Sequence, residues 1–162
     1  MHSKQKGALG EVAVIKDLLR RDYQVFKEIG DLSKVDLIVL VDHVPVKIQV
    51  KALVSKHGIV EVNSKKSGPG YSFRYGELDV DIFAVYIIDK DEIFYVSAKE
   101  ILNNKTTSKF RIVKPINNQL SGIRWVKDYQ EFKNALRDYT PSTLPALLEG
   151  DDIVQTTTER SG

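Results

Sequence analysis

The order of periodic segments predicts an α/β sandwich in which helices flank a mixed central β-sheet. A helical apolar pattern covers residues 7–21, and β-branched or aromatic runs follow at 35–41, 46–54 and 80–88. An amphipathic pattern at 126–139 predicts a further helix. The chain has 162 residues, which is enough for one domain with its own hydrophobic core.

The first helix is expected to pack through an apolar stripe. The apolar residues of "GALGEVAVIKDLLRR" recur at helical spacing, as Ala8, Val12, Ile15 and Leu19. Glu11 falls on or beside this stripe, although a carboxylate is costly to bury without a partner. Glu11 is therefore either a functional group or a first-turn acid that suits the helix dipole and stays in water.

A short strand at 23–29 and a loop at 30–34 are expected before the strand "VDLIVLV", which ends at the turn "DHVP". The next strand is predicted at 46–54, "VKIQVKALV", within the stretch "VPVKIQVKAL" and the residue after it. Side chains alternate along a strand, so Gln49 and Lys51 share one face while their apolar neighbours take the other. The shared face is either solvent-exposed or part of a functional site.

These two strands are expected to form an antiparallel hairpin. If Val41 lies opposite Val46, Asp36 lies opposite Lys51 and shares a face with Gln49. The other face is then wholly apolar, and a slip of the register by one residue would break that agreement. An acid that follows the first residue of such a strand can also be a solvent-facing strand end.

The second half of the chain is expected to alternate strands with basic loops. A Ser-, Lys-, Gly- and Pro-rich loop fills most of 55–79, and 105–124 is polar, basic and irregular. Ser97 and Glu100 form a predicted capping box at the start of a short helix. The further strands are predicted at 59–62, 80–88, 93–97 and 110–113.

Composition narrows the class of protein. The chain has no cysteine, which excludes disulfides and thiolate metal sites and fits a reducing cytosol. It has neither an apolar run of membrane-spanning length nor a signal-peptide core at its N-terminus, so we expect no membrane span, no export and a cytoplasmic location.

Charge divides the chain into a basic body and an acidic tail. Residues 140–162 carry four acids and one base, a net charge of −3. Because the whole chain has a net charge of +2, residues 1–139 carry +5. We expect one domain at 1–139 and a Pro-broken tail at 140–162 that is partly disordered or forms an interface. A basic body is compatible with a polyanionic partner.

An acid, an amide and a lysine on one strand face have a chemical use. Carboxylate and carbonyl oxygens are hard ligands that suit Mg²⁺, which lowers the pKa of bound water and stabilises charge on a phosphoryl oxygen. A lysine beside them can orient the nucleophile or stabilise the developing charge. Asp36, Gln49 and Lys51, approached by a helix that carries Glu11, therefore indicate metal-assisted phosphodiester hydrolysis.

"GALGE" on a first helix, "VDLIVL" on a strand and "IQVK" on the next strand resemble the PD-(D/E)XK nuclease superfamily. They are most similar to the small group I intron-encoded homing endonucleases of cyanobacteria, as is "VDIFAVYIIDKDEIFYVSAKEI" farther along the chain. The resemblance covers roughly residues 4–102. It implies a restriction-endonuclease-like fold and a Mg²⁺-dependent, site-specific endonuclease that cuts both strands of DNA.

Carried over residue by residue, Asp36 matches the metal-binding aspartate, Gln49 the D/E position and Lys51 the lysine of the motif. Glu11 matches a helix glutamate that occurs in part of the superfamily. The resemblance thus implies the catalytic residues Glu11, Asp36, Gln49 and Lys51, and metal ligation by Asp36, Gln49, Glu11 and the backbone carbonyl of Val50. The chain departs from the family at Val35, which replaces a non-ligating proline, and at Gln49, which replaces an acid as in the "QxK" variant.

Two basic segments are candidate DNA contacts, because lysine suits phosphates and arginine or amide side chains can read base edges. Each of these residues could equally be a solvated loop residue. The candidates are Lys34, Lys56, Lys65, Lys66, Arg74, Lys105, Lys109, Arg111, Lys114, Asn117, Asn118, Gln119 and Arg124.

A double-strand cut needs two active sites, so we expect a homodimer or a homotetramer. The segments 126–139 and "LPALL" are candidate interface elements, or ordinary core. Three alternatives remain open: a Holliday-junction resolvase or restriction-type nuclease with the same catalytic set, a DNA-binding module with a decayed site, and a structural α/β protein with incidental charges.

Overall fold

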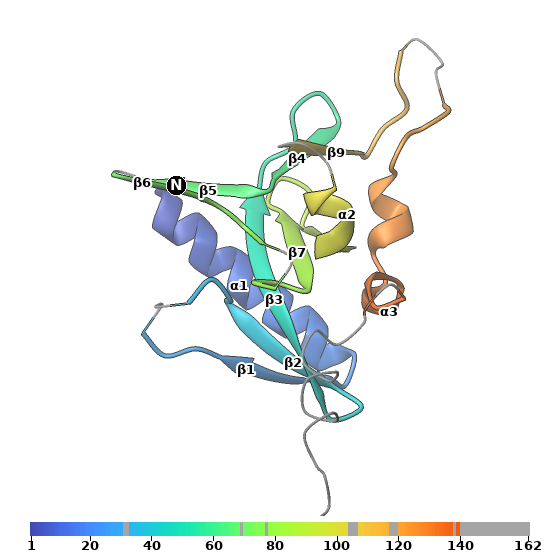
Figure 1. The fold of residues 1–162 in the computed structure, drawn as a ribbon. Coiled ribbons are helices and arrows are strands. Elements are labelled where there is room, and N and C mark those ends of the chain that lie inside the picture. The colour runs from blue at the N-terminus through green and yellow to red at the C-terminus, as the bar shows by residue number, and fades with distance from the viewer. Residues whose placement is uncertain are drawn as a thin grey trace, which may run out of the picture.

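The computed structural model describes residues 1–30, 33–68, 70–76, 78–103, 107–116, 120–137 and 139, so the tail at 140–162 lies outside the described part (Figure 1). The helices are α1 (Ser3–Arg20), α2 (Ala98–Leu102), α3 (Phe132–Ala135) and the 3₁₀ helix η1 (Val126–Tyr129). The strands are β1 (Gln24–Lys27), β2 (Leu37–Val41), β3 (Val44–Leu53), β4 (Ile59–Asn63), β5 (Lys65–Gly68), β6 (Tyr71–Arg74), β7 (Ile82–Ile87), β8 (Glu92–Ser97) and β9 (Thr107–Arg111). Among the described residues, no helix is both long and apolar enough to cross a membrane.

The central sheet is mixed, as the sequence predicts. Its strand order is β1-β2-β3-β7-β8, in which β3 and β7 are parallel and the other neighbours are antiparallel. Two further pairs, β4 with β9 and β5 with β6, form separate two-stranded sheets. The predicted α/β class with a mixed central sheet is therefore confirmed.

Each face of the central sheet has its own hydrophobic core. One cluster joins the sheet to α1 and α3 through residues such as Val14 and Phe132. The other joins it to β4, β9, α2 and η1 through residues such as Val60 and Phe110. Strand β3 contributes to both clusters, because Ile48 and its even-numbered neighbours face α1 while the odd-numbered side faces β4 and β9.

The β2–β3 hairpin has a tighter turn than the sequence analysis predicts. Val41 pairs with Val44, not with Val46, so the predicted register is wrong by two residues. The turn consists of Asp42 and His43 with φ of 49° and 67°, and two positive φ values suit the twist of a two-residue hairpin turn. A shift of two residues preserves the face of every side chain, so the predicted division into faces stands.

Helix α1 buries a different stripe from the predicted one. Gly10, Val14 and Leu18 are buried, whereas Val12 and Leu19 are exposed. The reason is the close approach of α1 to β3, since an added Cβ at Gly10 would lie 2.8 Å from the Cβ of Ala52. Both stripes have helical spacing, and only the one that contains the glycine can lie against the sheet.

Two segments differ from the sequence expectation in their secondary structure. The predicted loop after "IVEV" contains the β5–β6 hairpin, and the strand predicted at 110–113 is shifted to Thr107–Arg111, where alternating residues face the core as the partner of β4. The helix predicted at 126–139 is interrupted between η1 and α3. There the Gln130 carbonyl accepts from Arg21 Nη2 at 3.2 Å, and Glu131 has an extended backbone.

The contact between Gly10 and Ala52 predicts that two glycines of the same helix respond differently to alanine. Gly7→Ala should raise the free energy of unfolding by about 0.5–1 kcal/mol, because alanine favours a helix and the site is open. Gly10→Ala should lower it by about 1–3 kcal/mol through overpacking. Urea unfolding followed by circular dichroism measures both, and equal responses would show that α1 does not need the close approach.

Candidate active site

Asp36 lies at the point where strands β2 and β3 stop pairing through their backbones. Its N–H donates to the Ile48 carbonyl at 3.0 Å, which places it opposite Gln49 and not opposite Lys51. Its carboxylate Oδ2 accepts from the Val50 N–H at 2.7 Å and from Gln49 Nε2. The Asp36 carboxylate therefore accepts from the Val50 N–H of β3, and the two hydrogen bonds hold it in position.

Gln49 is only 4% exposed, which excludes the interpretation that it is a solvent-facing strand residue. Its Nε2 donates to the Asp36 carboxylate and also to the Val50 carbonyl, at 3.2 Å. Within the described residues, its Oε1 is buried and accepts no hydrogen bond. The amide nitrogen thus bridges the Asp36 carboxylate and the Val50 carbonyl by hydrogen bonds.

These groups fit a small divalent cation. A half-turn of the terminal amide would bring Gln49 Oε1 to the position of Nε2, beside the Asp36 carboxylate and the Val50 carbonyl. One carboxylate and two carbonyl-type oxygens are hard donors of the kind that Mg²⁺ prefers. No group of three or more His, Asp and Glu side chains in the described part could hold a metal ion, so an amide and a backbone carbonyl would have to complete the donor set.

Lys51 lies two residues beyond Gln49 on β3 and is half-buried beneath aromatic rings. Its Nζ is 4.7 Å from the centroid of the Tyr75 ring and 6.0 Å from that of Phe83. An ammonium over an aromatic face is attracted by the ring quadrupole, so the two rings restrict where Lys51 can point. The contact of Lys51 with Tyr75 was not predicted from the sequence, because Tyr75 comes from a segment predicted as a loop.

Glu11 contacts Lys27, a residue that the sequence prediction missed. Its carboxylate is paired with Lys27 Nζ at 2.6 Å, and α1 lies on the face of the sheet opposite to Lys51. Lys27 also lines a hollow of about 280 Å³ together with Asp36. The short loop between the strands at 23–29 and 35–41 could have indicated that Lys27 lies near Asp36. Strands joined by a short loop usually pair antiparallel, and this pairing puts Lys27 opposite Leu37, next to Asp36.

Several of the predicted DNA contacts already have partners within the chain. Lys34 Nζ pairs with Asp79 at 2.8 Å, Lys109 with Glu61 at 3.0 Å and Arg124 Nε with Glu100 at 3.4 Å, and Arg74 donates to the Leu102 carbonyl at 3.0 Å. Lys56, Lys65 and Lys114 are exposed, and Arg111 is half-buried. Lys105, Asn117, Asn118, Gln119 and the side chain of Lys66 lie outside the described residues.

The two basic segments are joined in the fold, although the sequence analysis treats them as separate. Strand β4 from the first segment pairs with β9 from the second, with Glu61 opposite Lys109. The inward residues Val60 and Phe110 are buried. The outward sides of both strands therefore belong to one surface.

Comparisons with known proteins identify a family and a similar fold. Residues 1–132 match the PD-(D/E)XK endonuclease family. In structure, the chain is similar to the bacterial homing endonuclease I-Ssp6803I, with 19% sequence identity, a TM-score of 0.66, and coverage of 86% of this chain and 100% of the other. At this identity the structural likeness shows the fold alone. No curated protein matches the sequence significantly.

The contact between Gln49 and Asp36 predicts the effect of an acid at position 49. Gln49→Glu replaces a donor to Asp36 by a second buried carboxylate, so without divalent cations the free energy of unfolding should fall by about 1–3 kcal/mol. A cation between the two carboxylates would remove the repulsion, so Mg²⁺ should restore most of the loss. Thermal unfolding in EDTA and in Mg²⁺ measures both effects.

Gln49→Leu is the matched control, because it loses the same hydrogen bonds without adding a charge. Its stability should fall in EDTA and should not recover in Mg²⁺. Equal responses of the two variants to Mg²⁺ would contradict a cation position between residues 36 and 49.

Proposed function

The chain belongs to the PD-(D/E)XK endonuclease family, and from this premise we propose that it is a Mg²⁺-dependent, site-specific endonuclease of the homing type that cuts both strands of DNA. The observation that carries the proposal is the convergence of the Asp36 carboxylate, the Gln49 amide and the Val50 carbonyl, with Lys51 two residues farther along the same face of β3. This arrangement combines hard oxygen donors for a metal ion with the Lys51 ammonium, whose position the Tyr75 ring restricts.

Asp36, Gln49 and Val50 would hold the metal ion in this proposal. A bound divalent cation supplies positive charge that stabilises a phosphoryl oxygen and acidifies water. The protein fixes the donors in advance, because the Val50 N–H and the Gln49 amide already hold the Asp36 carboxylate. Gln49 contributes no charge, which leaves Asp36 as the charged member of this set of three.

Lys51 would act on the reacting phosphate. Its ammonium can orient the nucleophile or stabilise charge that develops on the phosphoryl group. The ring of Tyr75 at 4.7 Å limits the freedom of the side chain, so less conformational entropy is lost when it meets a substrate.

Glu11 would supply the second negative charge of the proposed site. Its ion pair with Lys27, which lines the hollow beside Asp36, connects it to the same edge of the sheet. Lys27 would then also be close to a bound phosphate. A phosphate of the DNA could then replace Glu11 as the partner of Lys27.

DNA would be held by exposed basic residues of the β4–β9 and β5–β6 region. Lys56, Lys65 and Lys114 are exposed there, and Lys109 has only a surface ion pair with Glu61. Surface ion pairs of this kind contribute little to stability, so a phosphate can replace the carboxylate at small cost. A homodimer or homotetramer would place two active sites on the two strands of one target.

Three other functions differ from this one in an observable way. A junction resolvase or a restriction-type enzyme would use the same residues, and a preference for branched DNA or for a short palindrome would distinguish each of them. A DNA-binding module with a decayed site is favoured by the amide at position 49, which donates to Asp36 where the family has an acid. Such a module would bind DNA without cutting it.

We predict that three substitutions strongly reduce cleavage of plasmid and random duplex libraries in Mg²⁺. Asp36→Asn removes the negative charge of the proposed metal ligands, and Lys51→Ala removes the ammonium that would act on the phosphate. Each should reduce the cleavage rate by about 100-fold or more. Glu11→Gln should be nearly as damaging as Asp36→Asn. Lys90→Ala, in the exposed turn between β7 and β8, is the control and should cleave at the normal rate.

Gel-shift assays in Ca²⁺ show whether each variant still binds DNA, and circular dichroism shows whether it is folded. A wild-type chain that binds and never nicks in Mg²⁺ is the decayed module and not an enzyme. A Glu11→Gln variant that cuts at the normal rate removes Glu11 from the set and leaves the roles of Asp36 and Lys51 intact.

The DNA surface makes a separate prediction about salt. The logarithm of the binding constant should fall with the logarithm of salt concentration, by about 0.9 per phosphate contact. Lys56→Ala and Lys65→Ala should each reduce this slope by about one contact, whereas Lys90→Ala should leave it unchanged. Fluorescence anisotropy with a labelled duplex from 50 to 300 mM salt, about the range in which such contacts are lost, gives the slopes. Unchanged slopes would exclude these lysines from the DNA surface.

A further inference from the structure

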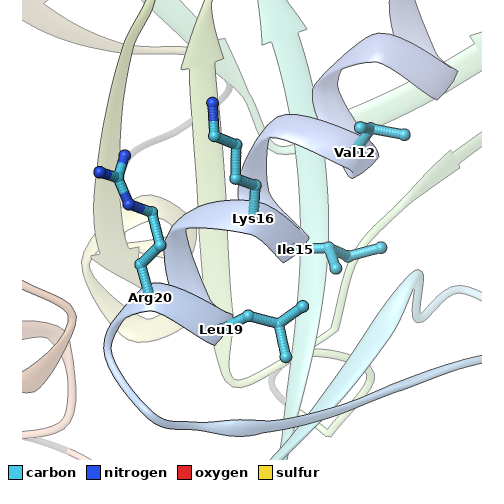
Figure 2. Close-up of a pocket in the computed structure, with 5 residues that line it drawn as sticks. All are labelled: Val12, Ile15, Lys16, Leu19 and Arg20. Carbon is cyan, nitrogen blue, oxygen red and sulfur yellow. The ribbon is translucent and has the colours of Figure 1, made fainter.

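Helix α1 has a second apolar stripe that faces away from the sheet. Val12 is 63% exposed and Leu19 is 54% exposed, and half-buried Ile15 lies between them at helical spacing. The three side chains line a hollow of about 450 Å³ together with the stems of Lys16 and Arg20 (Figure 2). The Gly10 contact with β3 fixes the rotation of the helix, so this stripe cannot turn toward the core.

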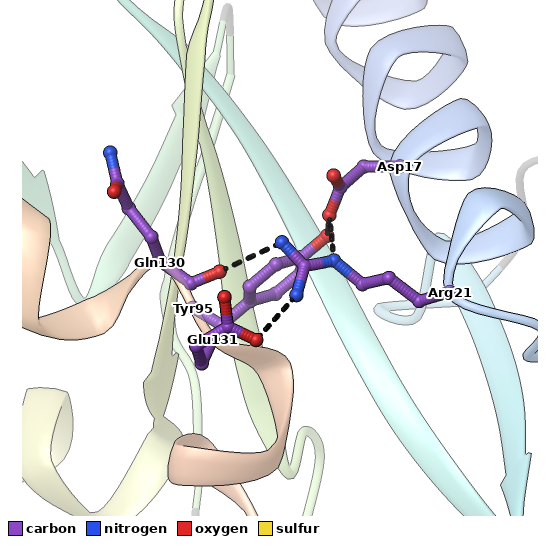
Figure 3. Close-up of polar contacts among 5 residues, drawn as sticks. All are labelled: Asp17, Arg21, Tyr95, Gln130 and Glu131. Atoms are coloured by element: carbon purple, nitrogen blue, oxygen red, sulfur yellow. Dashed lines mark hydrogen bonds and ion pairs between the residues drawn. The ribbon is translucent and has the colours of Figure 1, made fainter.

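The charged residues that line the hollow beside this stripe are both basic. Lys16 and Arg20 flank it, whereas the two acids of this part of the helix have partners elsewhere. Glu11 is paired with Lys27, and Asp17 accepts from Tyr95 Oη at 2.6 Å and from Arg21 Nε at 2.9 Å (Figure 3). A second copy of the same stripe would bring like charges together, which is unfavourable, so the surface suits an apolar segment that carries acids.

The chain contains such a segment. Residues 144–152, "LPALLEGDD", begin with Leu144, Leu147 and Leu148 and end with three acids, Glu149, Asp151 and Asp152. The apolar part matches the stripe of α1, and the acids match Lys16 and Arg20. Because its apolar residues precede its acids, one short segment can contact both the apolar stripe and the basic side chains beside it.

The described part of the chain ends beside the core cluster that α1 covers. Tyr139, the last described residue, packs against the same core cluster as Val14 and Leu18 of α1, and its hydroxyl donates to the Pro45 carbonyl at 3.0 Å. Arg21 at the end of α1 pairs with Glu131, just before α3, at 2.7 Å (Figure 3). Four residues lie between Tyr139 and Leu144, so five Cα–Cα steps can span roughly 17 Å. The diameter of a helix is about 10–12 Å, so this length is enough to pass from its inner to its outer side.

We propose that residues 144–152 cover the Val12–Ile15–Leu19 stripe of α1 in the same chain, with the acids of this segment facing Lys16 and Arg20. The C-terminal segment is then an intramolecular partner of the first helix and not an interface with another molecule. This proposal does not depend on nuclease activity.

Cysteine cross-linking tests the proposal cleanly, because the chain has no cysteine of its own. The double variant Val12→Cys/Leu147→Cys, oxidised at low protein concentration, should form a disulfide within one chain in most molecules. The matched control Val113→Cys/Leu147→Cys, which uses a side chain that is 51% exposed elsewhere, should form at least fivefold less. Mass spectrometry of tryptic peptides identifies the linked residues.

Each other outcome overturns the proposal. Equal cross-linking of the two double variants would mean that the segment has no preference for α1. Disulfide-linked dimers of Val12→Cys alone would mean that a second copy covers the stripe. Dimers that need both cysteines would mean that the segment crosses to a partner chain.

Hydrogen exchange adds a measurement without cysteines. In the full chain with Leu147→Ser and Leu148→Ser, amides of residues 12–20 should exchange several-fold faster than in the unmodified chain, whereas those of β7 should not change. Sodium chloride at high concentration should have a smaller effect in the same direction, because it screens the acids from Lys16 and Arg20. Unchanged exchange in α1 would overturn the proposal.

Discussion

The structure depends on the burial of both faces of strand β3. Between β2 and β7, its even-numbered residues pack toward α1 and its odd-numbered residues toward β4 and β9, so a shift by one residue would exchange Ile48 with the amide of Gln49. This constraint fixes the strand against its neighbours. It also places polar groups of the candidate active site directly on a rigid element, where their positions do not depend on a flexible loop.

The buried amide of Gln49 and the carboxylate of Asp36 lie together on the sheet face that the odd-numbered residues of β3 share. The Asp36 carboxylate ends the backbone pairing of β2 with β3, and Gln49 holds it with a neutral donor. Where the family has an acid, two carboxylates would repel each other in the absence of a cation. The amide instead donates a hydrogen bond to the Asp36 carboxylate, and within the described residues its own Oε1 stays buried without a donor.

Helix α1 shows how one small residue decides the use of a whole surface. Gly10 lets the helix approach Ala52, which turns Val14 and Leu18 inward and leaves Val12 and Leu19 outside. Tyr95, whose pKa is raised by burial and by its hydrogen bond to Asp17, helps to hold the end of the helix in place. The exposed stripe follows from this orientation and is not a separate feature of the sequence.

The sequence alone determined the α/β class, the main strands and the common face of Asp36 and Gln49, because alternation along a strand is a local property that survives a two-residue shift. Only the tertiary structure decided the register, which depends on the backbone of the Asp42–His43 turn, and the buried stripe of α1, which depends on Gly10. The pairing of β4 with β9 and the contact of Lys27 with Glu11 were also beyond the sequence. They join segments far apart in the chain, and local periodicity carries no information about such contacts.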